Sequence, residues 1–281
     1  MGRIGRGWTL TKKSWSVLRA DRSLFLFPVI SFIATVGAMV IIGGPAAAAY
    51  AGAENNEYVL IPFALVGLYA LTFIAVFFGT ALAGAAAKSL HGEDSKFADG
   101  MAVARSRLPQ IAAWAAVQAT VGAIISAIQG ALENNARGQI FAGLLNFAWA
   151  AATFFVIPII ALEGLGPRDA FKRSVSILRE RWGEGVVGSA AIGGLIFLAM
   201  LLPLIVLVGG GLAVQDSSQG GALALWALAA VIFAIGVLLS AALNAVFRVA
   251  LYDFAVNGRT EGAFTQEELT AAFRPKKTRG R

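Results

Sequence analysis

Six long apolar segments, with nearly all of the positive charge on one side of them, constrain this chain more than any other feature. A helix needs about 20 apolar residues to cross the core of a bilayer. The segments that meet this requirement are residues 24–50, 58–87, 108–132, 140–162, 186–214 and 222–256. The chain has 23 Lys and Arg residues. All except Arg137 lie before the first segment, in the second or fourth connection, or near the end of the sixth segment and beyond it.

This asymmetry predicts the orientation of the chain in the membrane. Lys and Arg are enriched in the cytoplasmic loops of membrane proteins. The first, third and fifth connections are short, and their charged residues are Glu54, Glu57, Glu133, Asp216 and Arg137. We therefore predict a multi-pass protein of the inner or plasma membrane, with the N-terminus and the C-terminus both in the cytoplasm.

The predicted fold is all-α, a polytopic membrane helical bundle. Its six transmembrane helices form three hairpins, joined by cytoplasmic amphipathic helices. We expect a single integral membrane domain over residues 1–281: a cytoplasmic amphipathic segment at 1–23, the six-helix bundle at 24–257 and a basic cytoplasmic tail at 258–281. The composition agrees, because 58% of the residues are hydrophobic and 14% are charged, against about 25% charged in soluble domains.

The first apolar segment has an alternative interpretation. It follows a basic start and contains the Ala-rich stretch 46–49, as a signal peptide does. The apolar run is too long for the central region of a typical signal peptide. We therefore expect an uncleaved first helix.

Several classes of site are excluded by composition. The chain has no cysteine, which excludes disulfides, thiolate zinc sites and a Cys nucleophile. It has one histidine, His91, so a multi-His metal site is excluded as well. The net charge of +7 is explained better by membrane topology and anionic headgroups than by nucleic acid. We expect no metal, no cofactor and no nucleic-acid partner.

A repeated sequence precedes the odd-numbered apolar segments. Residues 12–19 (KKSWSVLR) recur as 172–179 (KRSVSILR), and a weaker copy covers 101–107. This pattern predicts a threefold repeat of a cytoplasmic segment followed by a helical hairpin. Coincidence in a low-complexity chain is the alternative.

The basic segments are predicted to form amphipathic helices. Phe171, Val175, Leu178 and Trp182 recur at helical spacing, with cations on the other faces. Such helices either recruit anionic lipid or a protein partner, or simply seat the protein at the headgroup level. The candidate face for lipid or a partner consists of Lys12, Lys13, Arg19, Arg22, Arg105, Arg107, Lys172, Arg173, Arg179 and Arg181.

Uncharged polar residues within the apolar segments form a second candidate site. Gln118, Gln129, Asn146 and Asn244 either hydrogen-bond between helices or line a polar path. Pro203 is expected near mid-depth, where a broken helix builds transporter sites.

Charged residues occur only near the inner ends of the apolar segments, where we expect structural roles; a place in a substrate path is the alternative. Glu163 and Asp253 lie at such ends. Arg248 and Asp253 are five residues apart and are expected to pair either within the helix or with neighbours.

The chain carries no phosphate-binding loop, dinucleotide fingerprint, zinc-protease His pair or nucleophile elbow. We therefore expect a non-enzymatic organiser or accessory subunit that contacts anionic lipid, a protein partner or a second copy of itself through its basic face. The alternative is a small-solute transporter or channel. A membrane-embedded enzyme ranks third, because acid, base and nucleophile groups are missing from the membrane.

The opening block supports a family resemblance. It contains Gly2-Arg3, Gly7-Trp8, Leu10, Lys12, Ser14-Trp15, Val17-Leu18, Asp21, Leu24 and Phe27-Pro28. This block resembles the start of an uncharacterised family of bacterial and archaeal six-helix membrane proteins, known as a domain of unknown function. More loosely, the layout is similar to the membrane domain fused to some glycerophosphodiester phosphodiesterases. The resemblance implies a topology and transfers no catalytic residue.

Overall fold

The described residues are mostly helical, and no strand occurs among them. The computed structural model describes residues 15, 19, 21, 23–54, 56–133, 135–181 and 187–258, with backbone alone at 136, 181, 187–196 and 198. The elements are α2 (Ser23–Gly52), η1 (Glu57–Val59), α3 (Leu60–Leu90), α4 (Phe97–Ser106), α5 (Leu108–Ala131), α6 (Ala136–Ala152), α7 (Val156–Leu162), α8 (Pro167–Arg181), α9 (Val187–Val214) and α10 (Gln219–Asn257).

Five stretches of the described chain are long and apolar enough to cross a membrane. They are Ser23–Gly52, Glu57–Leu90, Leu108–Ala131, Arg137–Leu162 and Gln219–Asn257. In α9, the described side chains form the shorter apolar stretch Ala199–Val214. The prediction of an all-helical, membrane-embedded protein is therefore confirmed, with five spanning stretches among the described residues.

The fourth predicted helix is broken. Helix α6 ends at Ala152 and α7 begins at Val156, whereas one continuous helix was predicted over 140–162. Pro158 is the third residue of α7, where a helix has no intrahelical acceptor for its N–H groups and proline is therefore tolerated. The expected break at Pro203 is wrong, because Pro203 lies inside the continuous helix α9.

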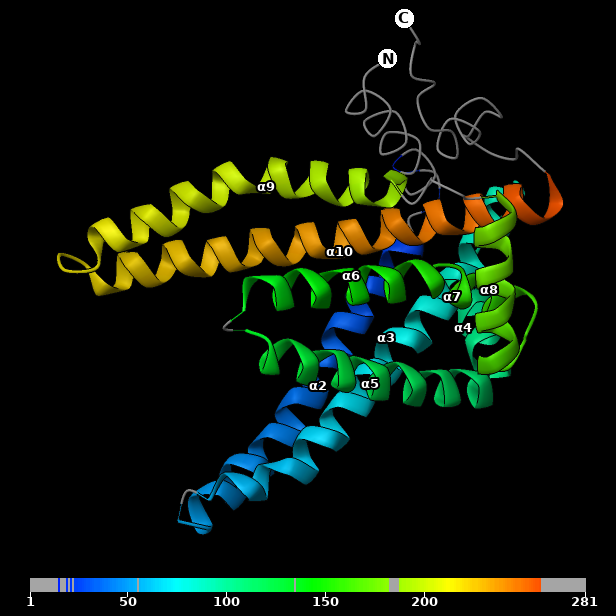
Figure 1. Ribbon diagram of the computed structural model, residues 1–281. Helices are drawn as coiled ribbons and strands as arrows, with labels where there is room; N and C mark the ends of the chain where they lie inside the picture. Colours follow the sequence, from blue (N-terminus) through cyan, green and yellow to red (C-terminus); the bar gives the residue numbers. More distant parts are fainter. Residues whose placement is uncertain are drawn as a thin grey trace, which may run out of the picture.

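The helices converge at one end of the molecule and spread apart at the other. Helix α3 is central and packs against α2, α4, α5, α7 and α10, while α9 packs along α10. In Figure 1 the pairs α2–α3, α5–α6 and α9–α10 fan out toward the left, and α4, α7 and α8 gather where the pairs meet. We name the converged end, with α4, α7 and α8, the basic end. The other end, where α2 returns as α3, α5 as α6 and α9 as α10, is the turn end.

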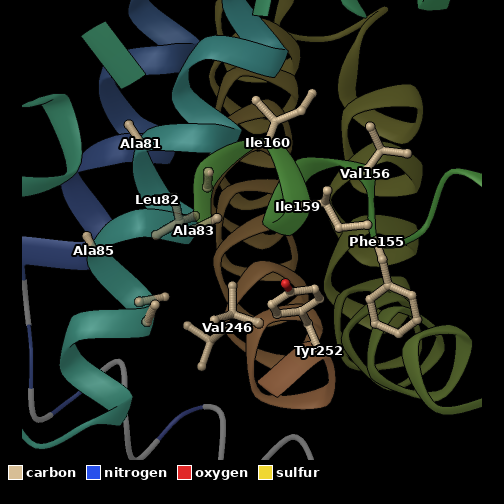
Figure 2. Packing of buried hydrophobic residues seen from close by; sticks show 14 of the residues in the cluster. Ala81, Leu82, Ala83, Ala85, Phe155, Val156, Ile159, Ile160, Val246 and Tyr252 are labelled. Carbon is tan, nitrogen blue, oxygen red and sulfur yellow. The ribbon is translucent and has the colours of Figure 1, made fainter. Parts of the chain in front are cut away.

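The hydrophobic core lies mainly at the basic end. In α2 only Leu24, Phe27 and Pro28 are buried, and the buried residues of α3 run from Val76 to Leu90. Figure 2 shows Ala81, Ala83 and Ala85 of α3 in this cluster, together with Ile159 and Ile160 of α7 and Val246 and Tyr252 of α10. Small alanine side chains let helix backbones approach closely, as in other membrane bundles.

Toward the turn end, large apolar side chains are exposed. Ile33 is 63% exposed, Ile41 73% and Leu202 70%. An apolar surface of this extent needs an apolar environment. The exposed helices are therefore suited to contact with lipid.

Each turn at the turn end is closed by a polar side chain that caps the returning helix. The side chain of Asn56 accepts a hydrogen bond from the Tyr58 N–H, and that of Asn135 accepts from Arg137 and Gly138. The hydroxyl of Ser218 accepts from the Gly221 N–H. Asn and Ser are favoured at this position because they satisfy otherwise unpaired N–H groups of the first helical turn.

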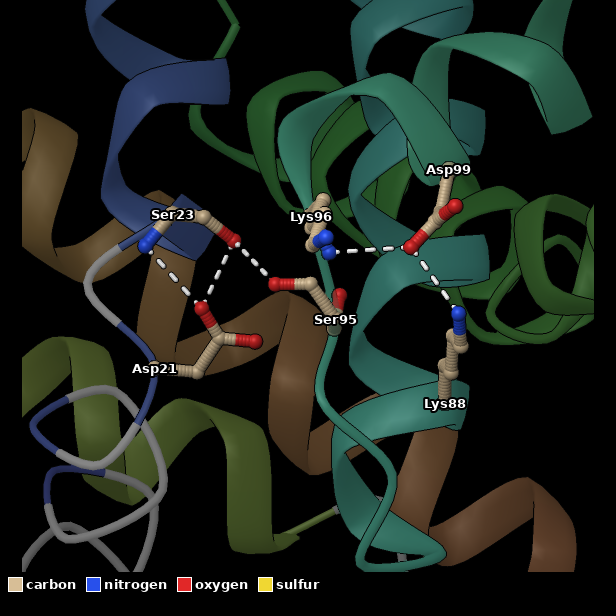
Figure 3. A network of polar contacts seen from close by, with 6 residues as sticks. All are labelled: Asp21, Ser23, Lys88, Ser95, Lys96 and Asp99. Carbon is tan, nitrogen blue, oxygen red and sulfur yellow. Dashed lines mark hydrogen bonds and ion pairs between the residues drawn. The ribbon is translucent and has the colours of Figure 1, made fainter.

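Polar contacts tie together the start of α2, the end of α3 and α4 (Figure 3). The Ser23 hydroxyl lies 2.6 Å from Asp21 Oδ1 and 3.0 Å from the Ser95 carbonyl oxygen. Asp99 Oδ2 accepts from Lys88 Nζ over 2.9 Å and from the Lys96 backbone N–H over 3.0 Å. These bonds fix the connection between α3 and α5 at the basic end.

Candidate functional site

Helix α8 lies across the basic end and packs against α5, α6, α7 and α10. Its fully buried side chains are Ala170, Ser174 and Ile177, at helical spacing. Phe171 and Leu178, which were expected to form the apolar face, are only partly buried against the core. The buried face is therefore rotated from the expected one toward Ser174, which bonds to the break between α6 and α7.

The cations of the predicted lipid or partner face fall into two groups. The side chains of Arg105, Lys172 and Arg179 are exposed at the basic end. Arg19 is also exposed, with its guanidinium 5.7 Å from the centre of the Trp15 ring. These four cations are accessible to a headgroup or a partner.

Two other cations of that face have structural contacts. Arg173 Nε lies 3.4 Å from Glu163 Oε1 and forms an ion pair with it. The guanidinium of Arg107 packs on the backbone of Gly164, so closely that a Cβ there would lie 2.5 Å from Arg107 Cζ. Lys12, Lys13 and Arg22 lie outside the described residues, and only the backbone of Arg181 is described.

Asp253 pairs with a neighbouring segment and not with Arg248, which is one of the two arrangements expected. Asp253 Oδ2 lies 3.4 Å from His91 Nε2, and Glu163 accepts a hydrogen bond from the Tyr252 hydroxyl. Arg248 forms no ion pair with Asp253, although the two are five residues apart. Successive helix residues are rotated by about 100°, so the two side chains point about 140° apart around the helix axis.

A cavity of about 650 Å³ lies between α2, α3, α6, α7 and α10. Most of its walls are apolar, with Phe78 from α3, Phe147 from α6 and Ile157 from α7 among them. Helix α6 packs mainly against α5 and α8, which leaves the space beside α2, α3 and α10 open. The cavity is within the size range of small-molecule sites, about 300–1,000 Å³.

The polar groups in this cavity come almost entirely from one face of α10. Ser240, Asn244 and Arg248 follow each other at intervals of four residues, and all three line the cavity. Asn244 Nδ2 donates to the Ser240 carbonyl oxygen over 2.8 Å, while its Oδ1 is buried without a hydrogen-bond partner. From α2, Ser31 adds a further hydroxyl.

Among the described residues, Arg248 is the one charged side chain that lines the cavity. Its guanidinium carbon lies 4.9 Å from the centre of the Phe154 ring, a cation–π contact. Its Nε is buried without a hydrogen-bond acceptor among the described residues, and no described carboxylate forms an ion pair with it. Because guanidinium N–H groups are strong donors, this side chain has hydrogen-bond donors available for an anion.

The four residues of the predicted polar path do not come together around this cavity. Asn244 lines it, whereas Asn146 and Gln129 are exposed and Gln118 on α5 is partly buried elsewhere. For Arg248 a structural role was expected ahead of a place in a substrate path, and the cavity that it lines was not predicted. The available signal was its spacing of four residues from Asn244 and eight residues from Ser240.

The described part of the chain contains no cluster of three or more His, Asp or Glu side chains that could hold a metal ion. At the basic end, Glu163 accepts a hydrogen bond from Tyr252 and forms an ion pair with Arg173. The Arg248 cavity and the exposed cations of the basic end are thus the candidate functional features.

Comparison with protein families gives one match. The family of unknown function DUF6159 matches residues 58–262, well over half of the chain. The chain belongs to this family. The match includes α3 to α10, and with them every cavity residue except those from α2. No curated protein matches the chain.

Membership in DUF6159 confirms the expectation of an uncharacterised family. The match begins at residue 58, so the opening block that carried the resemblance lies outside it.

Proposed function

We propose that this DUF6159 protein is a non-enzymatic integral membrane protein that organises anionic lipid, or a partner, through its basic end. In this proposal six helices span the bilayer as three hairpins, with α9 as the fifth span. Both termini and the basic end are in the cytoplasm. The observation that carries the proposal is the packing of α4 and α8 across the basic end, with Arg105, Lys172 and Arg179 exposed there.

The amphipathic character of α8 supports contact with a membrane surface. One face is anchored through Ala170 and Ile177, and Lys172 and Arg179 remain accessible. Each Lys or Arg near an anionic surface contributes about 1 kcal/mol to the attraction. The looser similarity to the phosphodiesterase-fused membrane domain adds only topology to this proposal.

Transport is the second candidate, and one observation favours it. The cavity between α2, α3, α6 and α10 contains an amide and a guanidinium. Against transport, Gln118, Gln129 and Asn146 do not line this cavity, so the structure offers no continuous row of the expected amides. We therefore rank lipid organisation first.

Cysteine labelling tests the topology. Ser217→Cys at the turn end and Glu93→Cys at the basic end both place the thiol at an exposed position in a natively Cys-free chain. In intact cells an impermeant thiol reagent should label Ser217→Cys alone, and after lysis it should label both. Labelling of Glu93→Cys in intact cells would contradict the proposed orientation.

Lipid analysis tests the role of the basic end. The protein purified in mild detergent should retain anionic lipids in excess of their share in the membrane. Replacing Arg105, Lys172 and Arg179 together by Gln should reduce this enrichment, while Arg137→Gln at the turn end should leave it unchanged. Equal lipid composition in all three proteins would reject the proposal.

A further inference from the structure

We propose that the Arg248 cavity is a specific site for one anionic phospholipid of the cytoplasmic leaflet. The phosphate binds the guanidinium of Arg248, and an acyl chain occupies the apolar part of the cavity. This inference rests on the proposed function for its orientation, and it assigns a defined site and ligand class within it.

The charge of the site selects an anion. Arg248 enters the cavity as a permanently charged group. Phe154 covers one face of the guanidinium at 4.9 Å, which holds its plane and leaves N–H groups at its edge for a ligand. None of the described carboxylates pairs with it, and its buried Nε has no acceptor among the described residues. A phosphate oxygen supplies the missing acceptor, and guanidinium binds phosphate with two parallel hydrogen bonds.

The walls of the site select an amphiphile over a free ion. Phe78, Phe147 and Ile157 line the same cavity as Arg248, and Phe147 also belongs to the exposed surface of α6. An inorganic ion would leave these apolar walls in contact with water. An acyl chain that enters beside α6 covers them, because that helix is separated from α2, α3 and α10.

The depth of Arg248 matches a headgroup. The rise from Leu223, near the turn end of α10, to Arg248 is about 38 Å at 1.5 Å per residue. The hydrocarbon core is about 30 Å thick, and the bilayer with its headgroups about 40–45 Å. In the proposed orientation the guanidinium therefore lies in the headgroup layer of the cytoplasmic leaflet. The cavity residues Asn244 and Ser240 lie deeper along α10, toward the hydrocarbon.

The test uses full-length protein in neutral detergent after lipid removal, with three probes: phosphatidylglycerol, phosphatidylcholine with the same acyl chains, and inorganic phosphate. Native mass spectrometry counts bound lipid, and thermal melting reports stabilisation. We expect one phosphatidylglycerol per chain that survives high salt and raises the melting temperature. Arg248→Gln should weaken its binding at least tenfold, and Arg248→Lys should weaken it less, because a charge remains without the paired donors.

A second variant keeps the proposal testable if Arg248→Gln fails to fold. Ala150 lines the cavity and is exposed, so Ala150→Trp fills the space and retains the charge. It should also displace the salt-resistant lipid. Arg137→Gln, at the turn end, is the matched control and should bind as the wild type does.

These experiments test the lipid site at Arg248 and the proposed function of the basic end separately. Equal binding of phosphatidylcholine would overturn the role of Arg248, and equal stabilisation by inorganic phosphate would show a free-anion site. If Arg248→Gln keeps the salt-resistant lipid while the triple variant of Arg105, Lys172 and Arg179 loses anionic enrichment, the site is wrong and the proposed function stands. If the triple variant keeps its enrichment and Arg248→Gln loses the one bound lipid, the site stands without the wider role.

Discussion

The hydroxyl of Ser174 on α8 accepts a hydrogen bond from the backbone N–H of Phe155 over 3.2 Å. The same hydroxyl donates to the carbonyl oxygen of Ala152 over 2.7 Å. Phe155 and Ala152 flank the break between α6 and α7. One buried side chain thus closes the break and anchors α8 to it.

Removing this hydroxyl should destabilise the protein. We expect Ser174→Ala to lower the free energy of unfolding by about 1–3 kcal/mol, because it removes both hydrogen bonds from the Ser174 hydroxyl to backbone groups at the break. Ser176→Ala is the matched control, since Ser176 bonds to Glu180 on the exposed side of the same helix. Its effect should stay within about 0.5 kcal/mol. Thermal melts in detergent measure both, and equal shifts would show that the break does not depend on Ser174.

The helices could be predicted from the sequence because an apolar run of spanning length has one common outcome in a membrane. Expected and observed limits agree closely for α5, 108–132 against Leu108–Ala131, and for α10, 222–256 against Gln219–Asn257. The break at 153–155 could not be predicted in this way. Its residues Thr153, Phe154 and Phe155 do not interrupt the apolar run, and the bond that closes the break comes from Ser174, 19 residues farther on.

Gly164 should be intolerant of a side chain mainly because of its backbone conformation. Its φ is +69°, and an added Cβ would also meet the Arg107 guanidinium at 2.5 Å, so the end of that side chain would have to move. The left-handed conformation alone costs about 1–2 kcal/mol for residues with a Cβ. Gly164→Ala should therefore lower the free energy of unfolding by at least that amount.

Gly166, two residues away, is the control. An added Cβ there meets nothing within 4 Å, so Gly166→Ala should be neutral or slightly stabilising. Combining Gly164→Ala with Arg107→Ala should recover the steric part of the loss and leave the backbone part. A loss for Gly166→Ala as large as that for Gly164→Ala would mean that the loop itself, and not this contact, is sensitive.

The contacts of Asp99 predict a dependence of stability on pH. The backbone N–H of Lys96 and the ammonium of Lys88 hold the pKa of Asp99 below its usual value of 3.8. A carboxylate with a lowered folded pKa stabilises the protein above its unfolded pKa, and this contribution is lost as the pH falls through the folded pKa. Because the carboxylate is exposed to solvent, we expect a small effect.

The comparison of wild type with Asp99→Asn measures this contribution. The difference between their melting temperatures should be constant above about pH 5 and should shrink as the pH falls below the unfolded pKa. Lys88→Gln should lower the melting temperature less than Asp99→Asn does, since the Lys96 N–H still binds the carboxylate. A difference that grows toward low pH would contradict the assigned contacts.

The candidate site was only partly predictable. Charge patterning identified the cations at the basic end, but it gave no way to separate the exposed Lys172 from Arg173, which pairs with Glu163. That distinction depends on which face of α8 meets the bundle. Arg248 was recognised as a charge near a helix end, while the cavity beside it results from the separation of α6 from α10, which no local pattern encodes.

A matched pair of substitutions tests the roles of two amides of the predicted polar path. Asn244 hydrogen-bonds to Ser240 and lines the cavity, whereas Asn146 is exposed on α6. Asn244→Leu should lower stability by no more than about 0.6 kcal/mol, the average for hydrogen bonds between helices in a membrane protein, because the Asn244 bond lies within α10 and its Oδ1 is unpaired. Asn146→Leu should be neutral or stabilising, because leucine suits a lipid-facing surface better than an amide does.

Neither change should alter solute flux if the protein organises lipid. In proteoliposomes loaded with a panel of small anions, we expect the same passive leak for wild type, Asn244→Leu and Asn146→Leu. A wild-type flux that Asn244→Leu reduces and Asn146→Leu leaves intact would favour the transporter alternative, since Asn244 lies next to Arg248 along the same cavity. Phosphatidylglycerol should still bind to Asn244→Leu, because its phosphate is held by the guanidinium. Loss of the lipid in that variant would instead assign the headgroup contact to the amide.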